Sequence, residues 1–329
     1  MSSFFLLVLA ALLALAPARA IADDNASACS RKFESYRQLK VAQGIAEKHL
    51  PVLRMAARDG TGANTVILIH GLFESPHFLR GIADEFQAAG NNVLSVLLPG
   101  QWEADRSLAD RVTYRDWLDE LDRAVAISAC LGRPVIFAGH SVGGLLALAG
   151  ALRHPRHSAG IALWAPALQL RALPALAGVL GTVLRLDGNL FTGRPADGDE
   201  TARLAPNLAL QAYALSQWMA TTFGDAGATV EELRRSEPLS MLHRGVYRKI
   251  SVPVAIVVAD NDPAVSVREA RRMYGEIDGR KTLIVYGRGP VWHGNLIKSP
   301  GDAYRIAPRD FNPWFSQMAH DVIQFFSRG

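Results

Sequence analysis

The feature that most restricts how this chain can fold is a serine enclosed by glycines, at the junction of an apolar strand and a helix. Residues 139–143 read Gly-His-Ser-Val-Gly, with Ser141 at the centre, after the apolar residues Val135–Phe137 and before a run of small and apolar residues. A serine on such a strand-to-helix turn has a strained backbone, and the glycines on either side let neighbouring chain pass close by. The pattern therefore predicts Ser141 as a nucleophile, flanked by the structural glycines Gly139 and Gly143.

Strands alternate with helices on both sides of this turn. Apolar runs predict strands at 65–69, 93–98, 135–137, 161–165, 252–258 and 282–286. Helices are expected at 77–89, 113–130, 266–277 and 314–326, with Thr113 as the cap of the second. This alternation is typical of a doubly wound, mostly parallel α/β sheet covered on both faces.

The regular pattern is interrupted once. Residues 167–248 contain Leu- and Ala-rich helical stretches and no convincing strand, so we interpret them as an inserted helical cap. The α/β core then comprises residues 64–166 and 249–329, preceded by an N-terminal extension at 21–63 with a helix near 31–39 and a strand near 50–56. Leu173, Leu176, Leu180 and Leu184 recur at near-helical spacing, which fits either an apolar lid over an acyl chain or the core of the cap.

The start of the chain resembles a secretory signal peptide. A short apolar run from Phe4 to Ala16 is followed by Pro17 and by Ala18-Arg19-Ala20, which predicts cleavage after residue 20 and a periplasmic or secreted product. The run is shorter than the roughly 20 residues that a membrane span needs. An uncleaved membrane anchor, or a lipoprotein acylated at Cys29, is the alternative.

Export would place the chain in an oxidising compartment. Its only two cysteines, Cys29 and Cys130, are then a candidate disulfide that ties the extension to the helix before the serine turn. Two unpaired thiols are the alternative.

Charge and composition exclude other classes of partner. The net charge of +4 comes from scattered Lys and Arg, without a basic block or an aromatic and basic stripe, so no nucleic acid is expected. No His, Cys and Asp cluster has metal-ligand spacing, so we expect neither a metal nor another cofactor.

Acid and base candidates follow two later strands. A serine needs a base to remove its proton, and the base needs a carboxylate to orient it. The strand at 252–258 leads into Asp260-Asn261-Asp262-Pro263, and the strand at 282–286 leads into a loop that contains His293. Since the carboxyl ends of parallel strands lie at one edge of a sheet, these groups are expected to meet Ser141 there.

The chain resembles the α/β-hydrolase superfamily over residues 64–326, and within it the monoglyceride lipase and lysophospholipase-like carboxylesterases. The resemblance is carried by His70-Gly71, the turn at Ser141, Trp164-Ala165-Pro166-Ala167-Leu168, Asp260-Asn261-Asp262-Pro263 and His293. It implies an α/β-hydrolase fold and a triad of Ser141, His293 and Asp262, with Asp260 as the alternative acid. It also implies an oxyanion hole formed by the backbone N–H groups of Leu72 and Val142.

That resemblance implies hydrolysis of carboxylic esters through an acyl-enzyme, on a small-molecule or lipid-like substrate. Acyl transfer by the same intermediate and a non-catalytic binding role on the same fold are the alternatives. Membrane contact is expected only through the N-terminus or the cap. The chain departs from many relatives at 97–102, which read Leu-Leu-Pro-Gly-Gln-Trp, and at Gly294, where an acidic residue is common.

Overall fold

The structure, a computed structural model, describes residues 27–56, 64–105, 107–131, 134–169, 205–225, 245–287, 289–299 and 311–328. The predicted signal peptide and the leucines at 173–184 lie outside these residues. No helix in the described ranges is both long and apolar enough to cross a membrane.

The described strands form one seven-stranded sheet in the order β1-β3-β2-β4-β5-β6-β7. Their bounds are β1 (Val52–Arg54), β2 (Thr65–Ile69), β3 (Asn92–Val96), β4 (Val135–His140), β5 (Ser158–Trp164), β6 (Val254–Ala259) and β7 (Lys281–Tyr286). Every neighbouring pair is parallel except β1 with β3. All residues of β2, β3, β4 and β6 are buried, as in a parallel sheet covered on both faces, so the predicted α/β fold class is confirmed.

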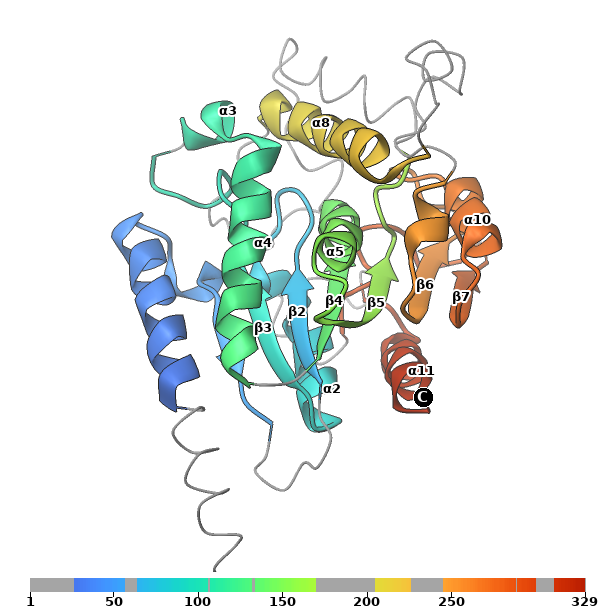
Figure 1. Cartoon of the computed structure of the whole chain (residues 1–329), viewed down its shortest axis with the longest axis horizontal. Coiled ribbons are helices and arrows are strands. Elements are labelled where there is room, and N and C mark those ends of the chain that lie inside the picture. The colour runs from blue at the N-terminus through green and yellow to red at the C-terminus, as the bar shows by residue number, and fades with distance from the viewer. Residues whose placement is uncertain are drawn as a thin grey trace, which may run out of the picture.

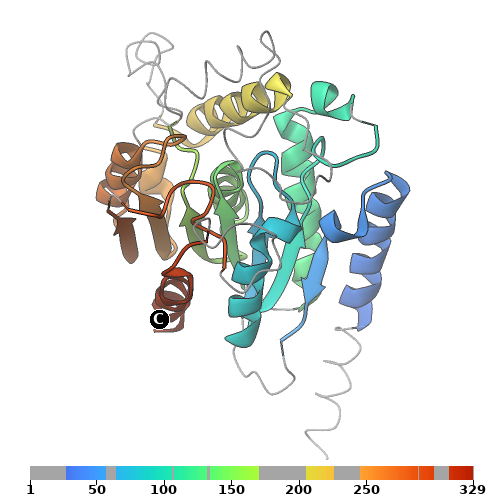
Figure 2. The same ribbon diagram turned by 180° about the vertical axis from the view of Figure 1, so that it is seen from behind.

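Helices cover both faces of this sheet (Figures 1 and 2). One face carries α4 (Tyr114–Ser128) and α5 (Val142–Arg153), and the other carries α2 (Arg80–Ala88) and α11 (Phe315–Ser327), which pack against each other. The remaining described helices are α3 (Leu108–Arg111), α8 (Pro206–Phe223) and α10 (Val267–Glu276). Short 3₁₀ turns are η1 (Glu47–His49), η2 (Pro76–Leu79), η3 (Ala129–Leu131) and η4 (Tyr247–Lys249).

Local chemistry explains where α4 begins. The Asp116 carboxylate accepts hydrogen bonds from the backbone N–H and the hydroxyl of Thr113, both at 2.7 Å. The first of these bonds satisfies a backbone N–H that the start of a helix leaves without an intrahelical partner, and the second fixes the side chain of the capping residue. The inner face of α4 then buries Trp117, Leu121 and Ala124 against the sheet, so cap and packing define the same helix.

The order of the strands locates a crevice. The chain passes from β2 to β3 on one side and then returns to β4 on the other side of β2. At such a reversal the connecting loops diverge, and open α/β sheets bind ligands there, beyond the carboxyl ends of the strands. Ser141 follows β4 directly and His70 follows β2, so both lie at this point. In Figure 1, α8 lies across the same edge of the sheet.

The N-terminal extension packs on the core through a helix at residues 27–42, drawn in blue in Figure 1. A disulfide joins Cys29 to Cys130 just after α4, with 5.5 Å between the two Cα atoms. A sulfur in a disulfide cannot also carry a lipid, which opposes the lipoprotein alternative. Further along this helix, Lys40 Nζ lies 3.1 Å from the buried carboxylate of Glu120 in α4. The same carboxylate accepts a hydrogen bond from the Tyr36 hydroxyl.

We expect removal of the disulfide to destabilise the protein without changing its fold. The bridge closes a loop of 101 residues, and removal of a native disulfide costs about 2–5 kcal/mol, in large part because the crosslink restricts the unfolded chain. The variants Cys29→Ser and Cys130→Ser, compared with wild type in urea unfolding, measure this. The double variant serves as the control and should match each single one, whereas additive losses would contradict a bridge between the two residues.

Candidate active site

The backbone at Ser141 is strained in the way the sequence pattern predicts. Its φ of 53° and ψ of −118° are unusual for a residue with a side chain. Hydrogen bonds hold this conformation, because Ser141 N–H donates to Trp164 O at 2.9 Å and Ser141 O accepts from Ala167 N–H at 2.9 Å. The side chain is therefore presented at the start of α5 by backbone contacts with the next strand.

The glycines beside the serine are required by space. A Cβ on Gly143 would overlap the carbonyl oxygens of Ile69 and His70, and one on Gly139 would overlap Gly143 O. The start of α5 thus passes directly against the end of β2. Any larger residue at Gly143 would push these two segments apart.

Asp262 and His293 extend from neighbouring strands toward Ser141. His293 Nδ1 lies 2.8 Å from Asp262 Oδ2, and its Nε2 lies 3.2 Å from Ser141 Oγ. A carboxylate can only accept, so Nδ1 carries the proton and Nε2 is free to accept from the serine hydroxyl. The structure therefore brings together the three residues that sequence analysis grouped.

Backbone groups and charge keep Asp262 ionised although its side chain is fully buried. Its Oδ1 accepts the N–H groups of Ala264 and Val265, at 2.8 and 2.9 Å. Burial alone would raise the pKa of Asp262, but the charge and hydrogen bond of His293, with these two N–H groups, lower it overall. For His293, burial lowers the pKa, yet the Asp262 carboxylate and the charge of Glu74 leave it above its ordinary value.

The alternative acid, Asp260, faces away from this group. Its side chain is 43% exposed and lies 3.4 Å from the guanidinium of Arg271. The turn after β6, closed by the Asp262 N–H bond to Ala259 O at 3.0 Å, buries the second aspartate and leaves the first at the surface. Asp262 is thus the carboxylate in contact with His293.

The backbone N–H groups predicted as oxyanion donors lie on two segments beside Ser141. Val142 is the first residue of α5, where N–H groups have no intrahelical acceptor and the helix dipole favours negative charge. Leu72 belongs to the His70 loop, by which we mean residues 70–75. This loop is adjacent to the serine, since a Cβ on Gly71 would lie 3.1 Å from Ser141 Cβ. Neither N–H has a hydrogen-bond partner among those found in the described residues.

His70 supports its loop as a neutral ring. Its Nε2 accepts the N–H of Leu98 at 3.0 Å, so Nδ1 must carry the proton, which it donates to Gly71 O at 2.7 Å. Burial lowers the pKa of His70 to about 4, which keeps the ring uncharged at neutral pH. His70 therefore connects the end of β3 to the loop that carries Leu72.

Sequence analysis missed a set of side chains that hold the loops in place. Asn295 is fully buried, accepts Trp292 N–H at 2.8 Å and donates to Pro290 O at 2.7 Å, which shapes the His293 loop, by which we mean residues 289–299. Glu74 and Gln101 perform similar contacts around the His70 loop. These residues have no periodicity or spacing that distinguishes them, so only their position in the fold reveals them.

Two further features bear on ligands. The described residues contain no group of three or more His, Cys, Asp or Glu side chains that could hold a metal ion.

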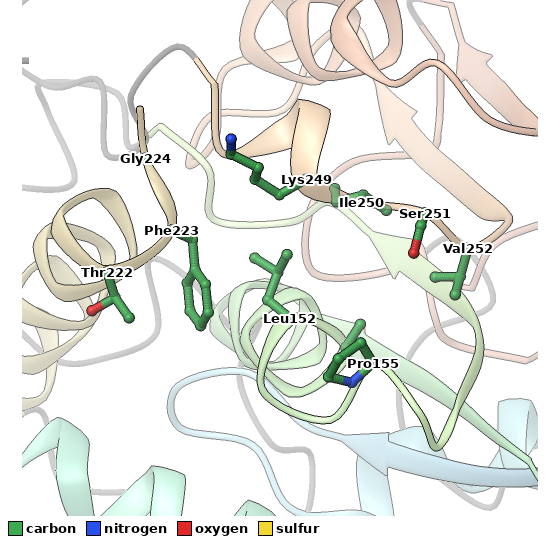
Figure 3. Close-up of a pocket in the computed structure, with 10 residues that line it drawn as sticks. Leu152, Pro155, Thr222, Phe223, Gly224, Lys249, Ile250, Ser251 and Val252 are labelled. Carbon is green, nitrogen blue, oxygen red and sulfur yellow. The ribbon is translucent and has the colours of Figure 1, made fainter. Parts of the chain in front are cut away.

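A cavity of about 370 Å³ lies between the end of α5, the end of α8 and residues 249–252 (Figure 3). Leu152 in its wall is eleven residues beyond Ser141 along α5, or roughly 16 Å along the helix axis. This cavity is therefore separate from the serine site.

The parallel sheet and the serine turn at its switch point define the chain as an α/β hydrolase. A family model described as serine aminopeptidase, S33, matches residues 61–296. This match spans well over half of the chain, so the protein belongs to that family of α/β hydrolases.

One curated relative is phospholipase YtpA of Bacillus subtilis (strain 168), which is 30% identical over 108 residues. The match covers 32% of this chain and 41% of the relative, so the chain aligns with less than half of that phospholipase.

Solved structures share the fold at low identity. The structure reported for the metagenome-derived lipolytic enzymes LipS and LipT has a TM-score of 0.58 and 17% identity, and covers 87% of this chain and 100% of its own. The monoacylglycerol lipase of Paleococcus ferrophilus has a TM-score of 0.56 and 18% identity, with 85% and 98% covered. Monoglyceride lipase of Saccharomyces cerevisiae has a TM-score of 0.52 and 13% identity, with 85% and 91% covered.

We expect the two aspartates after β6 to differ sharply in their effect on Ser141. Asp262→Asn removes the charge that orients His293 and should slow modification of Ser141 by a fluorophosphonate by about 10³- to 10⁴-fold. Asp260→Asn changes only an exposed ion pair and is the matched control, with a rate within about twofold of wild type. The reverse ranking would assign the orienting role to Asp260.

Proposed function

We propose that this protein is a serine hydrolase that cleaves carboxylic esters, and that its substrate resembles those of lipases or lysophospholipases. The observation that carries the proposal is the series of hydrogen bonds from Ser141 to His293 and from His293 to Asp262, at the carboxyl edge of the sheet. Membership of a hydrolase family and a partial match to a phospholipase support an acyl substrate.

The proposed mechanism uses the geometry in two steps. His293 Nε2 takes the proton of Ser141 as Oγ attacks the ester carbonyl, and the N–H groups of Leu72 and Val142 stabilise the negative oxygen that forms. The protonated His293, held by Asp262, then gives its proton to the departing alcohol. Water then gives a proton to His293 Nε2 and attacks the acyl-enzyme. The bond between the acyl carbon and Ser141 Oγ breaks, the carboxylic acid leaves, and His293 returns its proton to Oγ.

Turnover of p-nitrophenyl esters from acetate to palmitate tests this function. We expect hydrolysis by the wild-type protein and a loss of about 10⁶-fold in kcat for Ser141→Ala, because removal of the nucleophile leaves only binding and backbone contributions. The chain length that gives the highest kcat/KM reports how much acyl chain the site accommodates.

The control separates ester from amide cleavage. Aminoacyl p-nitroanilides carry the same chromophoric ring on an amide, so faster serine-dependent cleavage of these compounds would replace the ester proposal with an aminopeptidase. If protein that circular dichroism shows to be folded cleaves neither series in a serine-dependent reaction, hydrolysis of simple acyl substrates is contradicted altogether.

We also propose that the protein is exported and that residues 1–20 are removed. The Cys29–Cys130 disulfide supports this, because such bonds persist in oxidising compartments. N-terminal sequencing of the protein expressed with its complete leader should find Ile21 as the first residue. Recovery of an intact leader in the membrane fraction would favour an uncleaved anchor instead.

A further inference from the structure

A second buried acid and histidine pair lies directly behind Ser141. Glu74 is 8% exposed and His140 only 1%, and His140 Nδ1 lies 3.0 Å from Glu74 Oε2 and 2.9 Å from Oε1. His140 is the last residue of β4, immediately before the serine, and Glu74 belongs to the His70 loop. The proposed mechanism gives neither side chain a part in proton transfer.

The other nitrogen of His140 reaches the His293 loop. His140 Nε2 lies 3.1 Å from the main-chain oxygen of His293, and the two rings are 4.8 Å apart between centroids. A carboxylate oxygen and a carbonyl oxygen therefore lie against the two nitrogens of the His140 ring, one from each of the two loops. Burial by itself would raise the pKa of Glu74, but the charge and hydrogen bond of His140 and the Gly71 N–H lower it to about 2.

Glu74 in turn holds the loop that carries Leu72. Its Oε2 accepts the N–H of Gly71 at 2.8 Å, one residue before the predicted oxyanion donor. The backbone oxygen of Glu74 accepts Trp102 Nε1–H at 2.7 Å, so the far side of the loop is fixed as well.

The loop needs this support because its backbone is strained. Phe73 has a φ of 63°, a conformation that costs a residue with a side chain about 1–3 kcal/mol and persists only where the surroundings impose it. Gln101 Oε1 accepts the Phe73 N–H at 2.6 Å and contributes to the same restraint. The acceptor oxygen of Gln101 and the donor ring N–H of Trp102 both come from the segment that follows β3.

We propose that Glu74 and His140 are positioning residues that connect the His70 loop to the His293 loop. The continuous path runs from the Gly71 N–H through the carboxylate of Glu74 and the ring of His140 to the backbone of His293. Through this path the oxyanion donor and the base keep one fixed separation across Ser141. The inference rests on the proposed function, since it assigns a consequence to the same serine site.

Truncation of either residue should lower kcat rather than weaken substrate binding. A displacement of about 1 Å in catalytic groups costs about 100-fold in rate, so Glu74→Ala and His140→Ala should each lower kcat by about 10- to 100-fold, with KM within about threefold. Because both variants interrupt one path, the double variant should be no slower than the slower single one.

A conservative variant separates hydrogen bonding from charge. In Glu74→Gln, the amide oxygen can still accept from Gly71, and the amide N–H can donate to His140 Nδ1 while His140 Nε2 donates to His293 O. We therefore expect kcat for Glu74→Gln within about threefold of wild type. A loss as large as that of Glu74→Ala would overturn positioning by hydrogen bonds.

Glu269→Ala is the matched control for the loss of a buried carboxylate. Glu269 is 5% exposed on α10 and accepts the Tyr247 hydroxyl at 2.8 Å, so its removal should lower the melting temperature and leave kcat unchanged. A fall in kcat equal to that of Glu74→Ala would show that general destabilisation explains both, and would overturn the inference. Additive losses in the double variant would do the same.

Two assays of the wild-type protein and of Ser141→Ala keep the two proposals distinct. One is turnover of the p-nitrophenyl ester that wild type cleaves fastest, and the other is fluorophosphonate labelling. Serine-dependent activity with wild-type kcat in Glu74→Ala and His140→Ala would refute the inference alone. Absence of serine-dependent reaction in wild type would refute the proposed function and the inference with it.

Discussion

The close approach of α5 to the end of β2 is the contact on which the site depends. Because a Cβ on Gly143 would meet the backbone oxygens of Ile69 and His70, only glycine lets β4, the serine turn and β2 come together at the switch point. This places Ser141 beside the His70 loop and, through parallel pairing of β5, β6 and β7, at the edge that Asp262 and His293 also reach. One steric requirement thus aligns groups from four parts of the chain.

Continuous apolar strands were the most predictable part of the fold. The prediction for residues 65–69 coincides with β2, because an uninterrupted β-branched run has one compatible environment, a strand buried on both faces. Boundaries that depend on long-range contacts were less accurate. The expected helix at 77–89 is divided into η2 and α2. The N-terminal helix runs over 27–42 rather than 31–39, because Cys29 is bonded to Cys130 just after α4 and Lys40 contacts Glu120 of α4. The bounds of the cap at 167–248 stay a prediction, with α8 as its described helix.

The predicted site residues followed from strand ends and from resemblance, and the structure brings Ser141, His293 and Asp262 into hydrogen-bond contact. The sequence alone does not decide whether Asp260 or Asp262 contacts His293, because only the turn after β6 determines which carboxylate is buried. Glu74 and His140 were not predicted as a pair because their contact joins residues 66 positions apart, and a single sequence carries no signal for such a contact. His140 was recognised only as a neighbour of the serine.

The Cys29–Cys130 bridge has a consequence for biosynthesis. A chain with two cysteines has one intramolecular pairing, so an oxidant is sufficient and no isomerase has to correct a wrong bond. The bond cannot close until Cys130 has followed Cys29 out of the ribosome by 101 residues, and until then Cys29 is an open thiol on the leading segment. During this interval its competing partners are thiols of other molecules, so mixed disulfides and dimers are the characteristic by-products of premature oxidation.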